Sequence, residues 1–356
     1  MPLGRRHASK RISWGFICMT KVFATILLII CFVFAAKAQT FKIVSDDVKQ
    51  RIDVLIDGKL FTSYRFEERI RRPVLLPIMT VGGNFVTRGF PIETRNGEDI
   101  GHPHQVGSSL SFGDVNGIDF WNNSTYRTAK ELERMGRIIH RKVLKTIDGK
   151  GKAELVTESE WIMPNGKTLL LETTKYIFKV QRNARIIDRE TTWKAVEPAT
   201  FGDNKEGMFA IHLARELQQP SNEPEKITDE KGNVSETTDN AQVTGEYLNS
   251  EGLKDDKIWG TLGKWASVSG KIGGENVTVA VFDSPKNLNF PSSMMIRGYG
   301  LLALNPFGRK AFEPNAEPRK FILERGKTIT FRHRLVIISE KSNSANLEKF
   351  YQDFIK

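Results

Sequence analysis

The residues best suited to chemistry lie between Gly101 and Trp121, a stretch rich in histidine, aspartate and glycine. His102 and His104 are separated by one proline, and an extended backbone places residues i and i+2 on the same face. Pro103 favours extended geometry for His102 and fixes its own φ. We therefore expect both imidazoles to point the same way, as a pair for metal ligation, proton transfer or gripping a polyhydroxylated ligand.

Two further residues of this stretch have an open interpretation. Asp119 lies between apolar Ile118 and Phe120, so it either faces solvent on a strand or points into a cleft. Trp121 either belongs to the core or stacks on the face of a sugar ring. Asp114 and Asn116 suit a turn, because Gly117 after them tolerates positive φ.

Other candidate residues occur later in the chain. His212 shares its strand face with small residues, which fits either a satisfied interior group or a pocket group. Arg297 and Tyr299 are expected on one strand face, with room left by Gly298 and Gly300. Such a pair suits a carboxylate or an oxyanion, although an arginine that bridges strand-end carbonyls fits as well.

Several motifs with a known mechanism do not occur in the sequence. It contains no glycine-rich phosphate loop, no nucleophile elbow, no HExxH and no CxxC. We therefore predict no nucleotide cofactor and no metal, although a divalent metal on His102, His104 and either His212 or Asp119 is an open alternative.

The elements that must position these residues are β-strands joined by tight turns. Apolar and polar residues alternate in most of the expected strands, and Gly, Asn, Asp and Pro separate them. The expected strands are 51–56, 60–66, 136–147, 153–163, 167–180, 185–196, 208–214, 259–269, 276–282, 294–304 and 328–339. This pattern predicts an all-β fold, a large antiparallel β-sandwich.

Helices are expected at two places only. Residues 128–134 are short, whereas residues 344–355 have apolar positions at helical spacing behind an N-cap serine. The polar stretch 218–242 is expected to be a mobile loop, either a plain insertion or a lid over the site. We predict one sandwich domain over residues 39–343, followed by a C-terminal helix over 344–356.

The first 38 residues have the pattern of a secretory signal peptide. A basic start precedes an apolar run from Val22 to Ala36, and Ala36-Lys37-Ala38 resembles a cleavage site. Met19 is the expected natural start. Both cysteines, Cys18 and Cys31, fall within this segment, so a large core rather than disulfides must stabilise the mature chain. The prediction is a secreted or periplasmic protein with no stable membrane span after cleavage.

The net charge of +11 overstates the basic character of the mature chain. Six lysine and arginine residues and no acidic residue lie in residues 1–38, which leaves 47 basic and 42 acidic side chains. Their interleaving is not that of a nucleic-acid-binding surface, so we expect no nucleic acid partner.

Three segments together resemble a family of mostly secreted bacterial proteins catalogued as "methane oxygenase PmoA" or as a domain of unknown function. They are Arg72–Pro77 through Thr87–Pro91, His102–His104 through Gly113–Trp121, and Arg297–Leu301 through Asn305–Gly308. The resemblance implies a galactose-mutarotase-like β-sandwich, a fold that occurs in epimerases, lyases and carbohydrate-binding modules. It does not imply methane oxidation, because the namesake subunit spans a membrane many times and the mature chain has no apolar stretch of that length.

The resemblance also implies roles for the candidate residues. We expect a carbohydrate-active protein, a lyase, epimerase or hydrolase, in which His102 or His104 is the general base or acid and Arg297 and Tyr299 stabilise or protonate developing charge. Trp121 would stack on a ring. Asp119, His212 and Asn305 would bind hydroxyls or orient the histidines.

The alternatives are a non-catalytic glycan-binding or scaffold protein and a metal-dependent enzyme. The family pattern Asp-His-Pro-His-His-Arg is replaced here by Gly101, His102, Pro103, His104, Gln105 and Val106. The loss of polar groups from this pattern favours binding only, or altered specificity.

Overall fold

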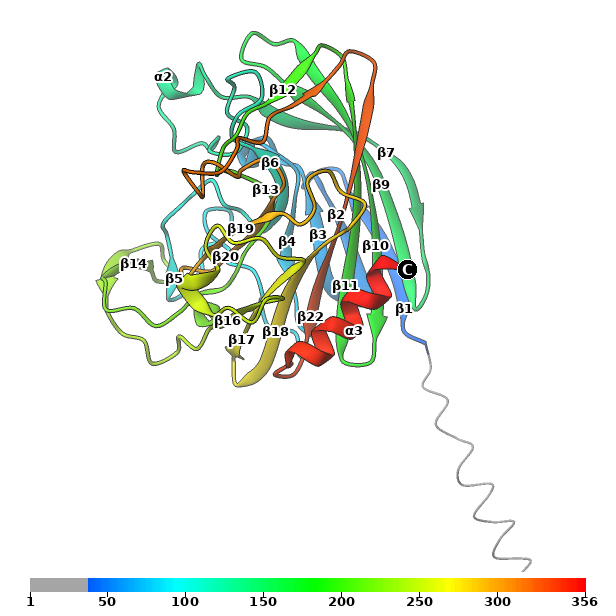
Figure 1. Cartoon of the computed structure of the whole chain (residues 1–356). Coiled ribbons are helices and arrows are strands. Elements are labelled where there is room, and N and C mark those ends of the chain that lie inside the picture. The colour runs from blue at the N-terminus through cyan, green and yellow to red at the C-terminus, as the bar shows by residue number, and fades with distance from the viewer. Residues whose placement is uncertain (1–37) are drawn as a thin grey trace, which may run out of the picture. The chain divides into compact units, whose positions relative to one another are not determined.

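Tight turns connect long strands into antiparallel sheets in the computed structural model, which describes residues 38–356 (Figure 1). Asp57 and Gly58 both have positive φ, 49° and 78°, which is the geometry of a two-residue hairpin turn. The expected all-β antiparallel sandwich is confirmed, since two large antiparallel sheets dominate the fold. The expected signal peptide falls outside the described residues, apart from Ala38.

The first sheet has nine strands in the order β19-β20-β13-β6-β4-β3-β2-β1-β8. Their bounds are β1 Thr40–Asp46, β2 Arg51–Ile56, β3 Lys59–Arg65, β4 Val74–Ile78, β6 Ser108–Phe112, β8 Gly149–Lys150, β13 Gly207–His212, β19 Ser293–Arg297 and β20 Leu301–Asn305.

The second sheet has eight strands in the order β16-β17-β18-β22-β11-β10-β9-β7. Their bounds are β7 Arg137–Ile147, β9 Lys152–Ile162, β10 Thr168–Gln181, β11 Ala184–Ala195, β16 Glu246–Asn249, β17 Trp265–Ile272, β18 Glu275–Asp283 and β22 Thr328–Ile338.

Two small sheets complete the β structure. One pairs β12 (Ala199–Phe201) with β21 (Phe321–Leu323), and the other joins β5 (Glu98–Asp99), β14 (Glu225–Thr228) and β15 (Val234–Thr237). The polar stretch 218–242, expected to be a loop, thus contains a short hairpin that pairs with β5.

The main core lies between the two large sheets, where aromatic rings from both meet. The ring centroids of Phe61, in the first sheet, and Phe178, in the second, are 6.1 Å apart. Trp161 and Trp193 pack edge to face, with ring centroids 5.1 Å apart. This core also encloses the carboxylate of Glu172, which accepts hydrogen bonds from both tryptophan nitrogens. Residues Gln39–Lys356 form one compact unit.

Helices are few and short. The expected C-terminal helix is present as α3 (Ser344–Ile355), with Asn343 rather than Ser344 as its N-cap. Its residues Leu347, Phe350 and Tyr351 pack on the outer face of the second sheet (Figure 1). The remaining helical segments are α2 Ala129–Leu132, η1 Glu68–Ile70, η2 Arg215–Leu217 and η3 Asp255–Ile258. Among the described residues, no helix has the length and apolarity needed to cross a membrane.

Two expected strands differ in the structure. The expected strand 294–304 is a hairpin, because the chain reverses at Gly298–Gly300 and Gly300 adopts φ of 94°. The expected strand 259–269 begins only at Trp265, since a turn at Trp259 and Gly260 and an irregular segment follow η3. In both places glycines within the apolar pattern permit the turn.

Candidate functional site

Adjacent strands of the first sheet bring the candidate residues to one end of the sheet. Ser108, at the start of β6, pairs with Ile211 near the end of β13. Leu301, at the start of β20, pairs with both His212 and Arg297. The histidine loop (residues 101–106), the end of β13 and the β19–β20 turn therefore meet.

The alternation of side chains decides which face carries the site. Phe209 and Ile211 point into the main core, whereas Ala210 packs in a separate cluster with Met295. By the two-residue period of a strand, His212 and Arg297 share that second face. The candidate site thus lies on the face of the first sheet that points away from the main core.

A pocket of about 410 Å³ opens on this face. Its volume is within the range of small-molecule sites. Four candidate residues from the sequence line it together, namely His102, His104, Arg297 and Tyr299. The other lining residues are Gln105, Asn122, Lys205, Glu206, Asp256, Trp259, Met295 and Gly298.

The ring of His102 stacks on that of Tyr299. Their centroids are 4.2 Å apart and their planes differ by 11°. Gln105 Nε2 donates a hydrogen bond to the Tyr299 hydroxyl at 3.3 Å. The two histidines also lie close, with centroids 6.0 Å apart, but not on an extended strand, because His102 has φ of 49°. The pairing is produced by a turn.

Burial keeps these groups uncharged near neutral pH. It lowers the pKa of His102, and it lowers the pKa of His104 to about 3, with Arg72 adding to the effect. Burial also raises the pKa of the Tyr299 hydroxyl. At pH 7 the pocket therefore holds neutral imidazoles, which accept protons, beside a protonated phenol, which donates one.

Arg297 is the cation of the pocket that lacks a partner. Its guanidinium carbon lies 3.4 Å from the centre of the Trp259 ring, and within residues 38–356 no carboxylate comes within 4.0 Å of its nitrogens. Lys205, by contrast, lies 3.8 Å from Glu206, whose pKa is raised by burial. A planar guanidinium with no carboxylate partner is suited to bind one from a ligand.

Buried polar atoms without partners surround the pocket. In the described part of the chain, His104 Nδ1 and Gln105 Oε1 have no hydrogen-bond partner. The same holds for both ring nitrogens of His212, which is 1% exposed and lies 5.8 Å from the Tyr299 ring. His212 does not line the pocket, and its ring is tilted by 38° against that of Tyr299. Unpartnered buried polar atoms are costly, so the two lining residues are prepared for a hydrogen-bonding ligand.

Three other candidate residues do not line the pocket and have structural roles instead. Trp121 is buried beneath Met295, with Arg72 over its ring at 5.9 Å, so it offers no face to a sugar. Asp119 accepts the backbone N–H groups of Trp121 and Asn122 in a local turn. Asn305 is fully buried and binds the carbonyls of residues 204 and 205, which positions Lys205 and Glu206.

Two buried arginines hold the histidine loop. Arg88 binds the Asp99 carboxylate at 2.7 Å and donates to the carbonyls of residues 99, 101, 102 and 105. Arg72 donates to the carbonyl of His104 and to those of residues 120 and 121. Neither arginine has a sequence pattern that indicates this role, although both lie in the segments that carry the family resemblance.

The metal alternative involves His102, His104 and either His212 or Asp119. The described residues contain no group of three or more His, Cys, Asp and Glu side chains in an arrangement that could hold a metal ion. His102 and His104 are close, but His212 lies behind Tyr299.

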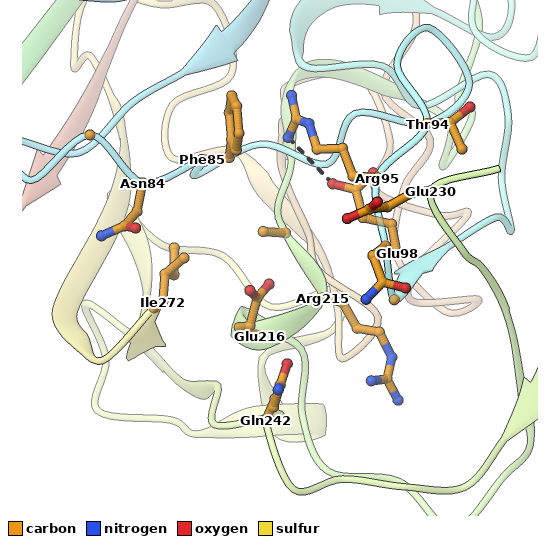
Figure 2. Close-up of a pocket in the computed structure, with 15 residues that line it drawn as sticks. Asn84, Phe85, Thr94, Arg95, Glu98, Arg215, Glu216, Glu230, Gln242 and Ile272 are labelled. Atoms are coloured by element: carbon orange, nitrogen blue, oxygen red, sulfur yellow. Dashed lines mark hydrogen bonds and ion pairs between the residues drawn. The ribbon is translucent and has the colours of Figure 1, made fainter. Parts of the chain in front are cut away.

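A larger hollow lies elsewhere. It has a volume of about 570 Å³ and shares no lining residue with the histidine pocket. Figure 2 shows Phe85, Arg95, Glu98 and Arg215 around it. The arginines there are paired, Arg95 with Glu93 and Glu98, and Arg215 with Glu225. Its cations are thus already neutralised, unlike Arg297.

Acid should destabilise the protein through His104. The pKa of this residue is about 3 in the folded chain and about 6.5 when unfolded. The unfolded chain therefore binds more protons between these values, and stability is lost as the pH falls below 6.5. We expect His104→Asn to remove about 1 kcal/mol of the loss between pH 6 and pH 5, measured by urea unfolding. Equal losses in wild type and variant would contradict this.

The comparisons with known proteins identify a family. A model described as a family of unknown function (DUF6807) matches residues 51–352. The chain belongs to this family. No curated protein matches the DUF6807 chain.

Solved structures similar to this DUF6807 protein are distant. The GH36 alpha-galactosidase AgaB from Geobacillus stearothermophilus is 9% identical with a TM-score of 0.39, over 84% of this chain and 41% of that one. A galactose mutarotase related enzyme from Lactobacillus acidophilus is 11% identical with a TM-score of 0.31, over 85% and 99%. The chain spans about two fifths of the length of this α-galactosidase and of two further α-galactosidase structures. At these levels neither likeness carries information about activity.

Proposed function

We propose that this protein binds an acidic carbohydrate in the histidine pocket and performs acid/base chemistry on it. The observation that carries the proposal is Arg297, a guanidinium without a carboxylate partner that lies beside the stacked His102–Tyr299 pair. A ligand carboxylate would pair with Arg297. Sugar hydroxyls, which both donate and accept, would satisfy the free atoms of His104 and Gln105.

The reaction that suits this geometry is proton abstraction next to the ligand carboxylate. Neutral His102 takes the proton from that carbon, while Arg297 stabilises the negative charge that develops on the carboxylate. Protonated Tyr299 donates its proton to the leaving glycosidic oxygen, so one C–H and one C–O bond break and a C=C bond forms. In an epimerase the proton would instead return to the same carbon from the opposite face.

Tyr299→Phe should lower turnover about 100- to 10,000-fold, because the variant lacks the proton donor. Ligand affinity should change little, since the ring still stacks on His102. We would test the chain from Gln39 onward against plant, algal and host glycans, following thermal stabilisation and the release of unsaturated or reducing-end products. Tyr126→Phe is the matched control, because Tyr126 is an exposed tyrosine outside the pocket.

The outcomes separate the alternatives. Turnover that survives in Tyr299→Phe and His102→Asn would refute the proposed chemistry. Stabilisation by glycans without any product would identify a binding protein, and turnover that is lost only with a chelator would identify a metal-dependent enzyme. No response to any acidic glycan would reject the carbohydrate proposal.

We also propose that the protein is exported. The support is the basic start, apolar run and small-residue cleavage pattern of residues 1–38. Protein recovered from a bacterial periplasm should begin at Gln39 by N-terminal sequencing, and an uncut N-terminus would argue against export.

A further inference from the structure

A second pocket continues from the first on the other side of Tyr299. It has a volume of about 350 Å³ and is lined by Gln218, Gln219, Pro220, Ser221, Glu223, Glu225, Asp256, Gly298 and Tyr299. Three residues, Asp256, Gly298 and Tyr299, line both pockets. The two hollows therefore meet at Tyr299, the residue that donates the proton in the proposed reaction.

Hydrogen bonds connect residues 217–219, at the wall of this second pocket, to the turn that carries Tyr299. Gln219 N–H donates to the Gly298 carbonyl at 2.8 Å. The Tyr247 hydroxyl is within hydrogen-bond distance of the carbonyls of Leu217 and Gly298, at 3.0 and 3.3 Å. The side-chain amide of Gln219 also lies against Gly298, where a Cβ atom would displace it. The wall and the turn thus form one unit.

The second pocket has its own unpartnered polar group. Gln218 is 2% exposed, and its Nε2 has no hydrogen-bond partner within residues 38–356. Because an amide nitrogen is a donor only, a ligand here must present an acceptor, as a hydroxyl or ring oxygen does. Burying such a donor without a partner costs free energy that a bound ligand would recover.

The charge of the second pocket is opposite to that of Arg297. Glu223 and Asp256 have no cation within 4.0 Å in the described structure, whereas Glu225 is paired with Arg215 at 2.9 Å. Free carboxylates accept hydrogen bonds from hydroxyls and repel a second carboxylate. Asp256 lines both pockets, so it is Glu223, which lines the second pocket alone, that disfavours a second carboxylate there and favours an uncharged sugar unit.

We infer that the second pocket is a subsite for a neutral sugar unit, so that the ligand is a mixed chain in which an acidic unit adjoins a neutral one across Tyr299. This inference rests on the proposed function, because the acidic unit occupies the histidine pocket. It adds the composition and minimum length of the ligand, two linked units, to that proposal.

Calorimetry of the chain from Gln39 onward tests the subsite. The probes are galacturonate and glucuronate as monomers, digalacturonate, and the mixed disaccharides galacturonyl-rhamnose and glucuronyl-N-acetylglucosamine. We expect at least one mixed disaccharide to bind about tenfold or more tightly than its acidic monomer, and digalacturonate to bind no more tightly than galacturonate.

Variants assign the gain to the subsite. Gln218→Leu should reduce the affinity for the mixed disaccharide about tenfold, the effect of losing one hydrogen bond to a buried donor, and leave the monomer unaffected. Gln242→Leu, at an exposed glutamine outside both pockets, should change neither. Glu223→Lys, at an exposed position that tolerates substitution, should allow digalacturonate to bind more tightly than galacturonate.

The failures are distinguishable. Monomer binding with no gain from a neutral neighbour, or a gain that survives Gln218→Leu, would overturn the subsite and leave the proposed function in place. Binding of none of these probes, with no response to the wider glycan panel, would overturn the proposed function and the subsite with it.

Discussion

Arg88→Met is expected to lower the free energy of unfolding by about 3–5 kcal/mol, the usual cost of removing one partner of a buried ion pair. Arg88 is 1% exposed, and the carboxylate of Asp99 would lose its guanidinium partner while still buried. Four backbone carbonyls between residues 99 and 105 would also lose a donor. Since these carbonyls belong to the segment that carries His102 and His104, ligand affinity should fall with stability.

Urea unfolding measures the first effect and calorimetry with the best glycan ligand the second. Arg137→Met is the matched control, because Arg137 is half exposed and its pair with Glu68 spans 3.6 Å, a kind of contact that contributes about 0–1 kcal/mol. Arg88→Met/Asp99→Asn should recover part of the lost stability, since it removes the uncompensated charge. An Arg88→Met protein within 1 kcal/mol of wild type would disprove the role assigned to Arg88.

Glu172→Gln should also destabilise the protein by about 3 kcal/mol or more, through the main core rather than the site. One oxygen of Glu172 accepts from Trp161 and Trp193 at 2.9 and 3.0 Å, and the other accepts from Thr174 and from Arg189 at 3.1 Å. A neutral amide leaves the buried charge of Arg189 without a partner and offers only one acceptor oxygen to these donors.

Two measurements identify this effect. Urea unfolding gives the loss of stability, and the fluorescence of the tryptophans should change in the folded variant because an indole N–H would lose its acceptor. Glu154→Gln is the control, since Glu154 forms a more exposed pair with Lys145 at 3.0 Å. If Glu172→Gln and Glu154→Gln cost the same free energy, the buried carboxylate does not stabilise the core.

Local patterns in the sequence predict most of the strands. Alternation and turn residues suffice for β2, β3 and the other long hairpins, because side-chain period and positive φ are local properties. They fail at Gly298–Gly300, where an apolar run continues through a turn. The sequence alone could not separate a strand from a hairpin there, since both keep the same residues buried.

The candidate site is only partly predictable, for a different reason. His102, His104, Arg297 and Tyr299 line one pocket, although a turn rather than a shared strand face brings each pair together. Trp259 and Glu206 were missed, because pairing between distant strands brings them to the pocket. Asp119 and Asn305 look like ligand-binding residues in the sequence, yet their polar atoms bind the backbone, the commonest partner of a polar side chain in a fold.

Arg72 and Arg88 donate hydrogen bonds to the backbone carbonyls of the histidine loop and not to its side chains. The path of this loop therefore depends mainly on backbone contacts, and on the burial of Val106, rather than on the side chains that line the pocket. Side chains that line the pocket, such as His102 and Gln105, can therefore be exchanged without a change in the arginines that hold the loop. Directed evolution restricted to residues 102, 104 and 105, which line the pocket, would sample new ligand preferences at little cost in foldability, whereas Val106 is buried in an apolar cluster with Ile70, Val74 and Leu76.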